Sequence, residues 1–299
     1  MSSSKKKRAR DEDATADTQV VRPLGGRVIL VTGAGGGIGR AACKLLASRG
    51  AHLIAADLNL KLAEETVSTI AAEANGARVA IAVQVDVADE KSVAAMMKAA
   101  IDEFGRLDGA LNAAGIEGER APIHECTLEN FERVINVNLR GTFLCMKAQL
   151  QQFLQQDEQD KPPPPSTKTS PSQSTLAPID EKNYVIVNIS STAGQAGMPE
   201  FSSYSSSKFG LLGLTRTAAK EYASKGVRVL AVCPSTTATP MVERFTERWP
   251  DWQAKQNASF PVGRIGQPEE VAALCGFLFS RECTMMTGCS LTIDGALGA

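Results

Sequence analysis

The fold of this protein is decided by the stretch RVILVTGAGGGIG at residues 27–39. A short apolar run ends in a glycine-rich turn, and residues 38–49 then follow a helical pattern. Glycines in such a turn let the backbone bend tightly and approach a pyrophosphate, which the helix N-terminus also favours. A glycine-rich turn alone is weak evidence, but its place between a first strand and a helix indicates a dinucleotide-binding unit.

The rest of the chain alternates apolar runs with helical patterns. The further strands are expected in AHLIAAD, RVAIAVQVDV, LDGALNAAG, YVIVNIS, VRVLAVCP and CSLTID, and the helices at 60–74, 90–104, 128–153, 203–224 and 268–280. Continuous apolar strands that alternate with helices predict a parallel sheet covered on both faces. We therefore expect an α/β, doubly wound, seven-stranded Rossmann-like sheet in one domain.

Two segments are predicted to lie outside the packed core. Residues 1–22 are polar and switch from basic to acidic, which is typical of a disordered tail. Residues 155–183 contain PPPPSTKTSPSQSTLAP and are predicted to form a disordered proline-rich insert, an inert loop rather than a ligand for a partner domain. The catalytic domain is then 23–299. Because the insert returns at a strand start, opposite the expected cofactor edge, we expect that it does not gate catalysis.

Composition excludes several classes of protein. The net charge of −1 lacks the basic excess of a nucleic-acid binder, and no apolar run reaches the roughly 18 residues of a membrane span. The seven cysteines form no C-x-x-C pair, which predicts reduced thiols, no metal site and a cytoplasmic protein. The basic cluster from Lys5 to Arg10 leaves a nuclear signal open, although a solvated tail is the favoured interpretation.

Asp57 closes the predicted second strand, where a carboxylate hydrogen-bonds the adenosine ribose and repels a 2′-phosphate. Leu58 and Asn59 follow it, with no basic residue directly after the strand. This favours NAD over NADP. Two alternatives stay open: Asp57 as an ordinary cap of the next turn, and Arg40 as a phosphate ligand.

Tyr204 and Lys208 are four residues apart at the start of a predicted helix, so both lie on one helix face. An ammonium close to a tyrosine favours its phenolate. Ser190 and Ser191 end the fifth strand and point to opposite faces, so only one of them serves the same site. A single Y-x-x-x-K is weak evidence, because it often occurs by chance.

Taken together, these motifs resemble the short-chain dehydrogenase/reductase family, in its main branch of roughly 250 residues. The elements that match, in order, are TGAGGGIG at 32–39, Asp57, DV at 86–87, NAAG at 112–115, VNLRGTF at 137–143, SS at 190–191, YSSSK at 204–208, PSTTATPM at 234–241 and IDG at 293–295. The resemblance covers about residues 24–297 apart from the insert. Its Tyr–Lys spacing disfavours the enoyl-reductase branch. Ser235 stands where the family usually has glycine.

The resemblance implies an enzyme that interconverts a secondary alcohol and a ketone by hydride transfer. It implies that Tyr204 is the general acid/base, that Lys208 binds the nicotinamide ribose and lowers the pKa of Tyr204, and that Ser191 polarises the substrate oxygen. Asn138 matches the asparagine that holds a water in the proton relay. The cofactor contacts it implies are Gly33, Gly37, Ile38, Gly39, Asp57, Asp86, Val87, Asn112, Gly115, Tyr204, Lys208, Thr237 and Thr239.

The expected partners are a small-molecule alcohol or ketone and, by resemblance, further copies of the chain in a homodimer or homotetramer. The substrate is expected among loops 116–126, 192–203 and 240–262; the last is equally consistent with a lid and with plain packing. His124 and Glu117 in the first loop are placed to touch substrate, but the favoured interpretation is that they are solvated surface residues. His52 is interpreted as a structural histidine. The alternative function is a non-catalytic nucleotide-binding or scaffold protein that keeps the fold.

Overall fold

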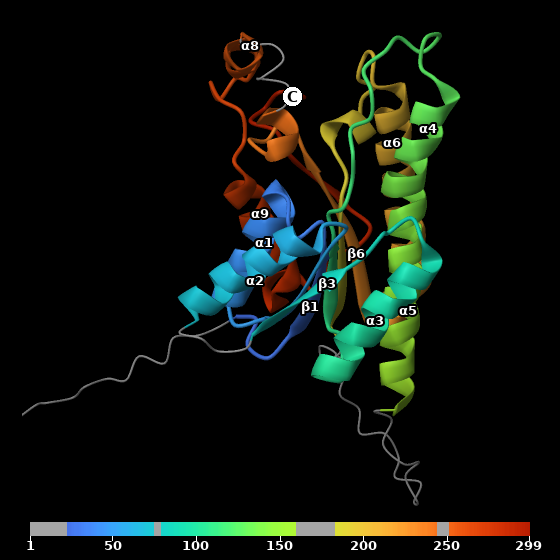
Figure 1. The fold of residues 1–299 in the computed structure, drawn as a ribbon, viewed down its shortest axis with the longest axis vertical. Helices are drawn as coiled ribbons and strands as arrows, with labels where there is room; N and C mark the ends of the chain where they lie inside the picture. Colours follow the sequence, from blue (N-terminus) through green and yellow to red (C-terminus); the bar gives the residue numbers. More distant parts are fainter. Residues whose placement is uncertain (1–22, 75–78, 160–182, 244–250) are drawn as a thin grey trace, which may run out of the picture.

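The structure, a computed structural model, describes residues 23–74, 79–159, 183–243 and 251–299 (Figure 1). Its centre is a parallel seven-stranded sheet with the strand order β3-β2-β1-β4-β5-β6-β7. The strands are β1 Val28–Thr32, β2 His52–Asp57, β3 Ala80–Gln84, β4 Gly109–Asn112, β5 Tyr184–Ile189, β6 Val227–Pro234 and β7 Ser290–Ile293. The predicted fold class is confirmed.

Helices connect the strands and cover both faces of the sheet. They are α1 Gly37–Ser48, α2 Leu60–Glu73, α3 Glu90–Phe104, α4 Leu128–Ile135, α5 Gly141–Gln159, α6 Ser202–Tyr222, α8 Trp252–Ser259 and α9 Pro268–Phe279. Helices α1, α2 and α9 lie on one face, and α3, α5 and α6 on the other (Figure 1).

Strand β1 shows why the strands are continuously apolar. Ile29 and Val31 pack into the cluster under α1 and α9, whereas Val28 and Leu30 pack into the cluster under α3 and α5. All four side chains are almost fully buried. A strand that is buried on both faces has no position for a solvated polar residue, so the period-2 alternation of half-exposed strands is absent.

The sheet runs outward in both directions from β1 and β4. Strand β1 pairs with β2 on one side and with β4 on the other. The connections leave the carboxyl ends of these two strands toward opposite faces, which opens a crevice where ligands bind in such sheets. The glycine-rich turn, directly after β1, lies at this crevice.

The first residues of the predicted insert are helical. Residues 155–159, assigned to it from sequence, form the last turn of α5. Gln156 explains this, because its buried side chain accepts from the backbone N–H of Leu107 (2.8 Å) and donates to the Leu107 carbonyl (2.9 Å). Those two bonds tie the helix end to the start of β4. Residues 160–182 and the predicted tail at 1–22 lie outside the described residues.

Asn183, which precedes β5, is held at the amino-terminal edge of the sheet by two arginines. Its backbone carbonyl accepts from Arg27, and its side-chain oxygen accepts from Arg228 at 2.9 Å. Arg228 also donates to the Leu278 carbonyl at the end of α9 (2.8 Å). The predicted insert therefore rejoins the fold at the edge opposite the crevice.

Within the described ranges, no helix is both long and apolar enough to cross a bilayer. The same ranges hold no group of three or more His, Cys, Asp or Glu side chains placed to bind a metal ion. All seven cysteines are free thiols. Burial raises the pKa of Cys43, Cys145 and Cys275 to about 12, so these three stay protonated and unreactive.

Candidate active site

The glycine-rich turn is packed too tightly for side chains. Gly33 has a φ of +70°, and a Cβ there would lie 2.9 Å from the backbone nitrogen of Ala114, beyond β4. A Cβ on Gly39 would lie 2.1 Å from the carbonyl oxygen of Gly33. The N-cap of α1 is Gly36, which has no side chain to cap the helix. The first turn of α1 therefore presents backbone N–H groups and the positive end of the helix dipole, as a pyrophosphate requires.

Asp57 joins the end of β2 to this turn. One carboxylate oxygen accepts from the N–H of Gly35 and the other from the N–H of Asn59, both at 2.9 Å. The bond to Asn59 is the turn-capping role that the sequence left open, and it places the carboxylate beside the glycine turn. Arg40 has an acidic partner in Glu65 of α2, at 3.4 Å on the surface.

Tyr204, Lys208 and Ser191 meet beyond the end of β5. The Ser191 hydroxyl lies close enough to the Tyr204 hydroxyl to lower its pKa, and the Nζ of Lys208 lies 5.5 Å from the centre of the Tyr204 ring. Nζ donates to the Ile189 carbonyl at 2.8 Å. The buried hydroxyl of Ser190 instead donates to the Lys208 carbonyl at 2.9 Å. Of the two serines, Ser191 is the one that faces the site.

Burial dominates the electrostatics of this pair. It raises the pKa of Tyr204 above its usual 10, while the hydrogen bond from Ser191 lowers it and the charge of Glu117 raises it further. Burial also lowers the pKa of Lys208 to about 8. Burial thus outweighs the other effects on Tyr204 in the protein without ligands. The expected lowering of its pKa by Lys208 stays a prediction.

The buried ammonium of Lys208 makes folding stability depend on pH. A folded-state pKa of about 8, against an ordinary 10.5, means that the charged form costs stability. This cost is present in full below about pH 8 and disappears as the pH rises to about 10.5. At pH 7, we expect Lys208→Met to raise the free energy of unfolding by about 1–2 kcal/mol. This value already subtracts the contribution of the hydrogen bond to Ile189, which the variant loses.

Thermal unfolding of the ligand-free protein at pH 7 and pH 10 measures this effect. The gain of Lys208→Met over the unmodified chain should shrink at pH 10. Lys220→Met, an exposed position on the same helix, is the control and should show no such change. A gain from Lys208→Met that is equal at both pH values would contradict the assignment.

Asn138 lies in a π-helical turn, Asn136–Arg140, between α4 and α5. Its buried amide accepts from the N–H of Ile116 and donates to the Ile116 carbonyl, both at 2.8 Å, and it also donates to the Ser207 hydroxyl at 3.1 Å. A Cβ on Gly115 would lie 3.2 Å from the Asn138 oxygen and 3.6 Å from Nζ of Lys208. The structure thus brings together Asn138, Gly115 and Lys208; Ser207 was missed from sequence.

Asn112 does not face the crevice with its side chain. Its amide donates to Asn188 (2.9 Å) and accepts from Gln149 (2.8 Å), and Asn188 donates to Thr215 (3.0 Å). All four side chains are buried, and they join β4 and β5 to α5 and α6. The side chain of Asn112 is therefore engaged inside the sheet, and its expected place beside the cofactor at the end of β4 stays a prediction. The sequence did hold a signal for this network: each of its four polar residues stands at a position of a strand or helix where an apolar residue is expected.

The other predicted cofactor residues lie on two segments, one after β3 and one after β6. Asp86 is exposed and accepts from the N–H of Ala88 (2.9 Å), while Val87 is buried. Thr239 comes from the loop after β6, and its methyl group would lie 2.4 Å from a Cβ on Gly37. Thr237 on the same loop pairs with Gly266. The segment after β6, late in the chain, thus packs against the glycine-rich turn.

His124 and Glu117, both in the first predicted substrate loop, differ in their exposure to solvent. His124 is exposed beside Glu125, as expected. Glu117 is half-buried, and its charge contributes to the raised pKa of Tyr204, so it is less exposed than His124. In loop 240–262, Phe260 is packed in the interior. Phe245 and Trp249 lie outside the described residues, as does the side chain of Trp252.

His52, on β2, packs beside Phe104, with ring centres 5.6 Å apart.

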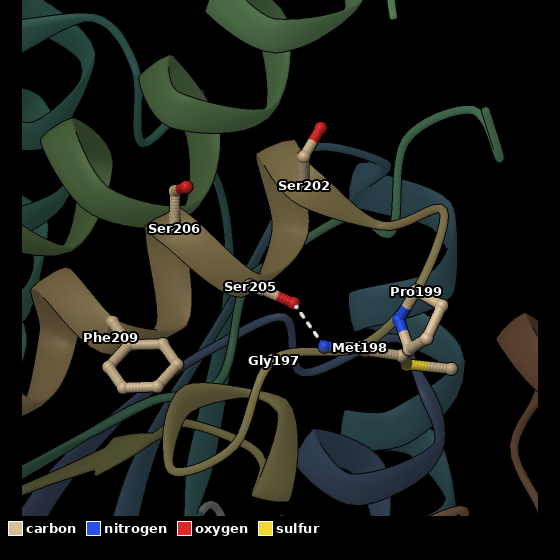
Figure 2. A pocket seen from close by; sticks show the side chains of 7 residues that line it. All are labelled: Gly197, Met198, Pro199, Ser202, Ser205, Ser206 and Phe209. Carbon is tan, nitrogen blue, oxygen red and sulfur yellow. Dashed lines mark hydrogen bonds between the residues drawn. The ribbon is translucent and has the colours of Figure 1, made fainter. Parts of the chain in front are cut away.

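A hollow of about 510 Å³ lies between the loop at 197–199 and α6 (Figure 2). Figure 2 shows Met198 and Phe209 beside it, and the hydroxyl of Ser205 accepting from the backbone N–H of Met198 at 3.2 Å. Tyr204 and Lys208 do not line this hollow. The hollow lies along a different face of α6 from the face that carries Tyr204 and Lys208.

A family profile described as short chain dehydrogenase matches residues 27–160, and one described as Enoyl-(Acyl carrier protein) reductase matches residues 173–297. The chain is 35% identical to a 2,5-dichloro-2,5-cyclohexadiene-1,4-diol dehydrogenase of Sphingobium indicum (92% of this chain and 98% of the relative covered). It is 38% identical to a cis-4-hydroxycyclohexanecarboxylate dehydrogenase of Sinomonas cyclohexanicum (91% and 97%), and 35% identical to a cyclohexanol dehydrogenase of an Acinetobacter species (90% and 94%).

Solved structures share the whole fold. Levodione reductase superposes with a TM-score of 0.79 at 32% identity, covering 91% of this chain and 97% of the other. A 3-ketoacyl-(acyl-carrier-protein) reductase from Brucella melitensis, crystallised with NADH, superposes with a TM-score of 0.77 at 28% identity (92% and 100%).

Proposed function

The chain belongs to the short-chain dehydrogenase family, and from this premise we propose that it is an NAD(H)-dependent oxidoreductase that interconverts a secondary alcohol and a ketone. The observation that carries the proposal is the contact of Tyr204 with Ser191 and Lys208, at the sheet edge that holds the glycine turn. We place this enzyme in the cytoplasm, which seven free thiols support.

The residues present fit a nicotinamide dinucleotide. The uncapped first turn of α1 suits its pyrophosphate, Asp57 its adenosine ribose, and Lys208 its nicotinamide ribose. Asp86 and Val87 are proposed to border the adenine, and Thr237 and Thr239 the nicotinamide. When bound, this cofactor supplies the hydride exchange.

The proton is handled by the chain itself. In reduction, the Tyr204 hydroxyl protonates the oxygen of the carbonyl group, and in oxidation its phenolate removes the proton of the alcohol. Ser191 holds the substrate oxygen, which aligns it with Tyr204. Lys208 is proposed to pass protons between Tyr204 and a water molecule. Asn138 is proposed to hold that water, which continues the proton relay.

The proposed preference for NAD rests on the carboxylate of Asp57. A 2′-phosphate would meet this negative charge beside the glycine turn, and Arg40, which would offset it, is paired with Glu65. We expect kcat/KM to be higher with NADH than with NADPH. In Asp57→Asn the ratio should fall at least about tenfold, because the amide keeps an acceptor but removes the repulsion.

Steady-state kinetics with both cofactors measure this ratio. Glu64→Gln, an exposed acidic position on α2, is the control and should leave the ratio unchanged. A strong preference of the unmodified chain for NADPH would overturn the assignment of Asp57.

The proposed substrate class is a secondary alcohol or ketone on a six-membered ring. Its support is that relatives covering most of this chain are named for ring alcohols, a ring diol and a ring hydroxy acid. The Tyr204–Lys208 spacing favours this chemistry over that of an enoyl reductase. The test is a panel of cyclohexanol, cyclohexanone, levodione and a 3-ketoacyl thioester, with NAD(H) and NADP(H) in parallel. Cofactor binding without turnover of any compound would favour the non-catalytic alternative.

We also propose that the chain forms a homodimer or homotetramer through α5 and α6. Its support is that Phe143 on α5 and Phe209 on α6 are each 47% exposed, since large exposed apolar side chains are common at subunit contacts. Sedimentation equilibrium tests this, and a monomer at all concentrations would contradict it.

A further inference from the structure

We propose that Ser207 is a positioning residue for the proton relay: its buried hydroxyl joins the side chain of Asn138 to the backbone of Tyr204, and so fixes the spacing between the acid/base and the groups behind it. This inference rests on the proposed function. It extends that function to a residue that has no proposed contact with substrate or cofactor and that acts only through its neighbours.

The hydroxyl of Ser207 is buried and makes two hydrogen bonds. It donates to the Tyr204 carbonyl at 2.7 Å and accepts from Nδ2 of Asn138 at 3.1 Å. A hydroxyl has one proton, and a carbonyl only accepts, so the proton of Ser207 is committed to Tyr204. Ser207 can therefore receive Asn138 only as a donor. The two bonds run in one direction, from the amide of Asn138 to the turn of α6 that carries the acid/base.

The amide group of Asn138 has no spare proton. One proton of Nδ2 goes to the Ile116 carbonyl at 2.8 Å and the other to Ser207, while the side-chain oxygen accepts from the N–H of Ile116 at 2.8 Å. The side chain is fully buried. Removing the hydroxyl of Ser207 therefore leaves a buried donor without its partner, which is an unfavourable state that the surrounding structure relieves by moving.

Ser207 is the polar link between the π-helical turn Asn136–Arg140 and α6. Among the residues that the structure describes, no other hydrogen bond joins these two segments. On its other side, Asn138 lies close to Lys208: a Cβ on Gly115 would lie 3.2 Å from the Asn138 oxygen and 3.6 Å from Nζ of Lys208. The bond from Asn138 to Ser207 therefore sets where Tyr204 and Lys208 lie relative to Asn138.

Proton transfer depends steeply on this spacing. A shift of a reacting group by about 1 Å is enough to cost up to about 10²-fold in rate. Without the hydroxyl of Ser207, the turn of α6 that carries Tyr204 is no longer held against Asn138. The hydride exchange depends instead on the cofactor, which the glycine turn and Asp57 are proposed to hold. Loss of Ser207 should therefore slow the proton step more than the hydride step.

Thr215, about two turns further along α6, offers a matched comparison. Its buried hydroxyl donates to the Leu211 carbonyl at 2.8 Å and accepts from the amide of Asn188 at 3.0 Å. Both hydroxyl groups thus accept from a buried asparagine and donate to a carbonyl of the preceding helical turn. Thr215→Val removes the same pair of bonds from the same helix, but on the side of the core and away from Tyr204.

The test is steady-state oxidation of cyclohexanol with NAD, in H2O and in D2O, at matched points of the pH and pD profiles. In Ser207→Ala, we expect kcat to fall at least about fivefold while KM for NAD stays within about twofold. The ratio of kcat in H2O to kcat in D2O should rise, because the proton step becomes more rate-limiting. In Thr215→Val, kcat and this solvent isotope effect should stay within about twofold of the unmodified chain.

A second variant guards against a folding defect. Ser207→Cys fills nearly the same space with a thiol, which is a weak donor and a weak acceptor. It should change kcat and the solvent isotope effect in the same direction as Ser207→Ala. The Tm of all three variants is measured, so that rates are compared below the unfolding transition of each. Failure of both Ser207 variants to fold, while Thr215→Val folds, would overturn the inference in favour of a purely structural role.

The remaining outcomes separate this inference from the proposed function. Turnover by the unmodified chain, with kcat of Ser207→Ala within twofold of it, overturns the role of Ser207 and leaves the proposed function standing. A lower kcat with an unchanged solvent isotope effect also overturns it, as does an equal loss in Thr215→Val, which would indicate a general loosening of α6. No turnover of any ring alcohol by the unmodified chain overturns the proposed substrate class together with this inference.

Discussion

Replacing Tyr204 by phenylalanine is expected to lower kcat about 10²- to 10⁴-fold in both directions, because the variant loses the group that gives and takes the proton. The change removes a single oxygen atom. The interaction of its hydroxyl with Ser191 is lost, while the ring keeps its place under Nζ of Lys208. We therefore expect cofactor affinity and thermal stability to stay close to those of the unmodified chain.

Turnover of cyclohexanol and cyclohexanone, together with titration of NADH fluorescence, separates chemistry from binding. Tyr222→Phe, at the last residue of the same helix, is the matched control and should keep its rate. The unmodified chain should oxidise faster as the pH rises above neutrality, because burial raises the pKa of Tyr204 and oxidation needs its phenolate. A rate for Tyr204→Phe within twofold of the unmodified chain would remove the basis of the mechanism.

The second large effect is expected at the glycine turn. A methyl group on Gly39 would lie 2.1 Å from the carbonyl oxygen of Gly33, so Gly39→Ala forces the backbone of the turn to move. Overpacking of this kind costs about 1–3 kcal/mol of folding free energy, or roughly 5 °C in Tm for a chain of this length. Because the displaced backbone carries the N–H groups of the proposed pyrophosphate site, cofactor affinity should fall at least about 100-fold.

Gly36→Ala provides a matched control in the same turn. A Cβ there has one neighbour within 4 Å, the Gly33 carbonyl oxygen at 3.6 Å, which is an ordinary contact. Its Tm without cofactor should equal that of the unmodified chain. Equal stability of the two variants would show that the tight contact at Gly39 does not constrain the turn.

Much of the fold was predictable because its signals are local. The run at 28–32, buried on both faces, and the helical pattern after it identify a parallel sheet without knowledge of the partners of any strand. The length of α5 was not predictable in this way. Its last turn is polar and adjoins a proline-rich stretch, and it is helical because Gln156 binds Leu107, 49 residues earlier in the chain.

The candidate site shows the same division. The four-residue spacing from Tyr204 to Lys208 places both side chains on one face of any α-helix, so that pair could be predicted from the sequence alone, as could the glycine turn and the acidic strand end at Asp57. Packing between distant segments is what sets the bond from Asn112 to Asn188 inside the sheet, and the bonds from Asn138 to Ile116 and from Asn130 to Glu119 in the loop after β4. Asparagine forms equally good bonds in a core, a turn or a ligand site. Which of these it enters depends on the segments that folding brings beside it, and those lie far away in the chain.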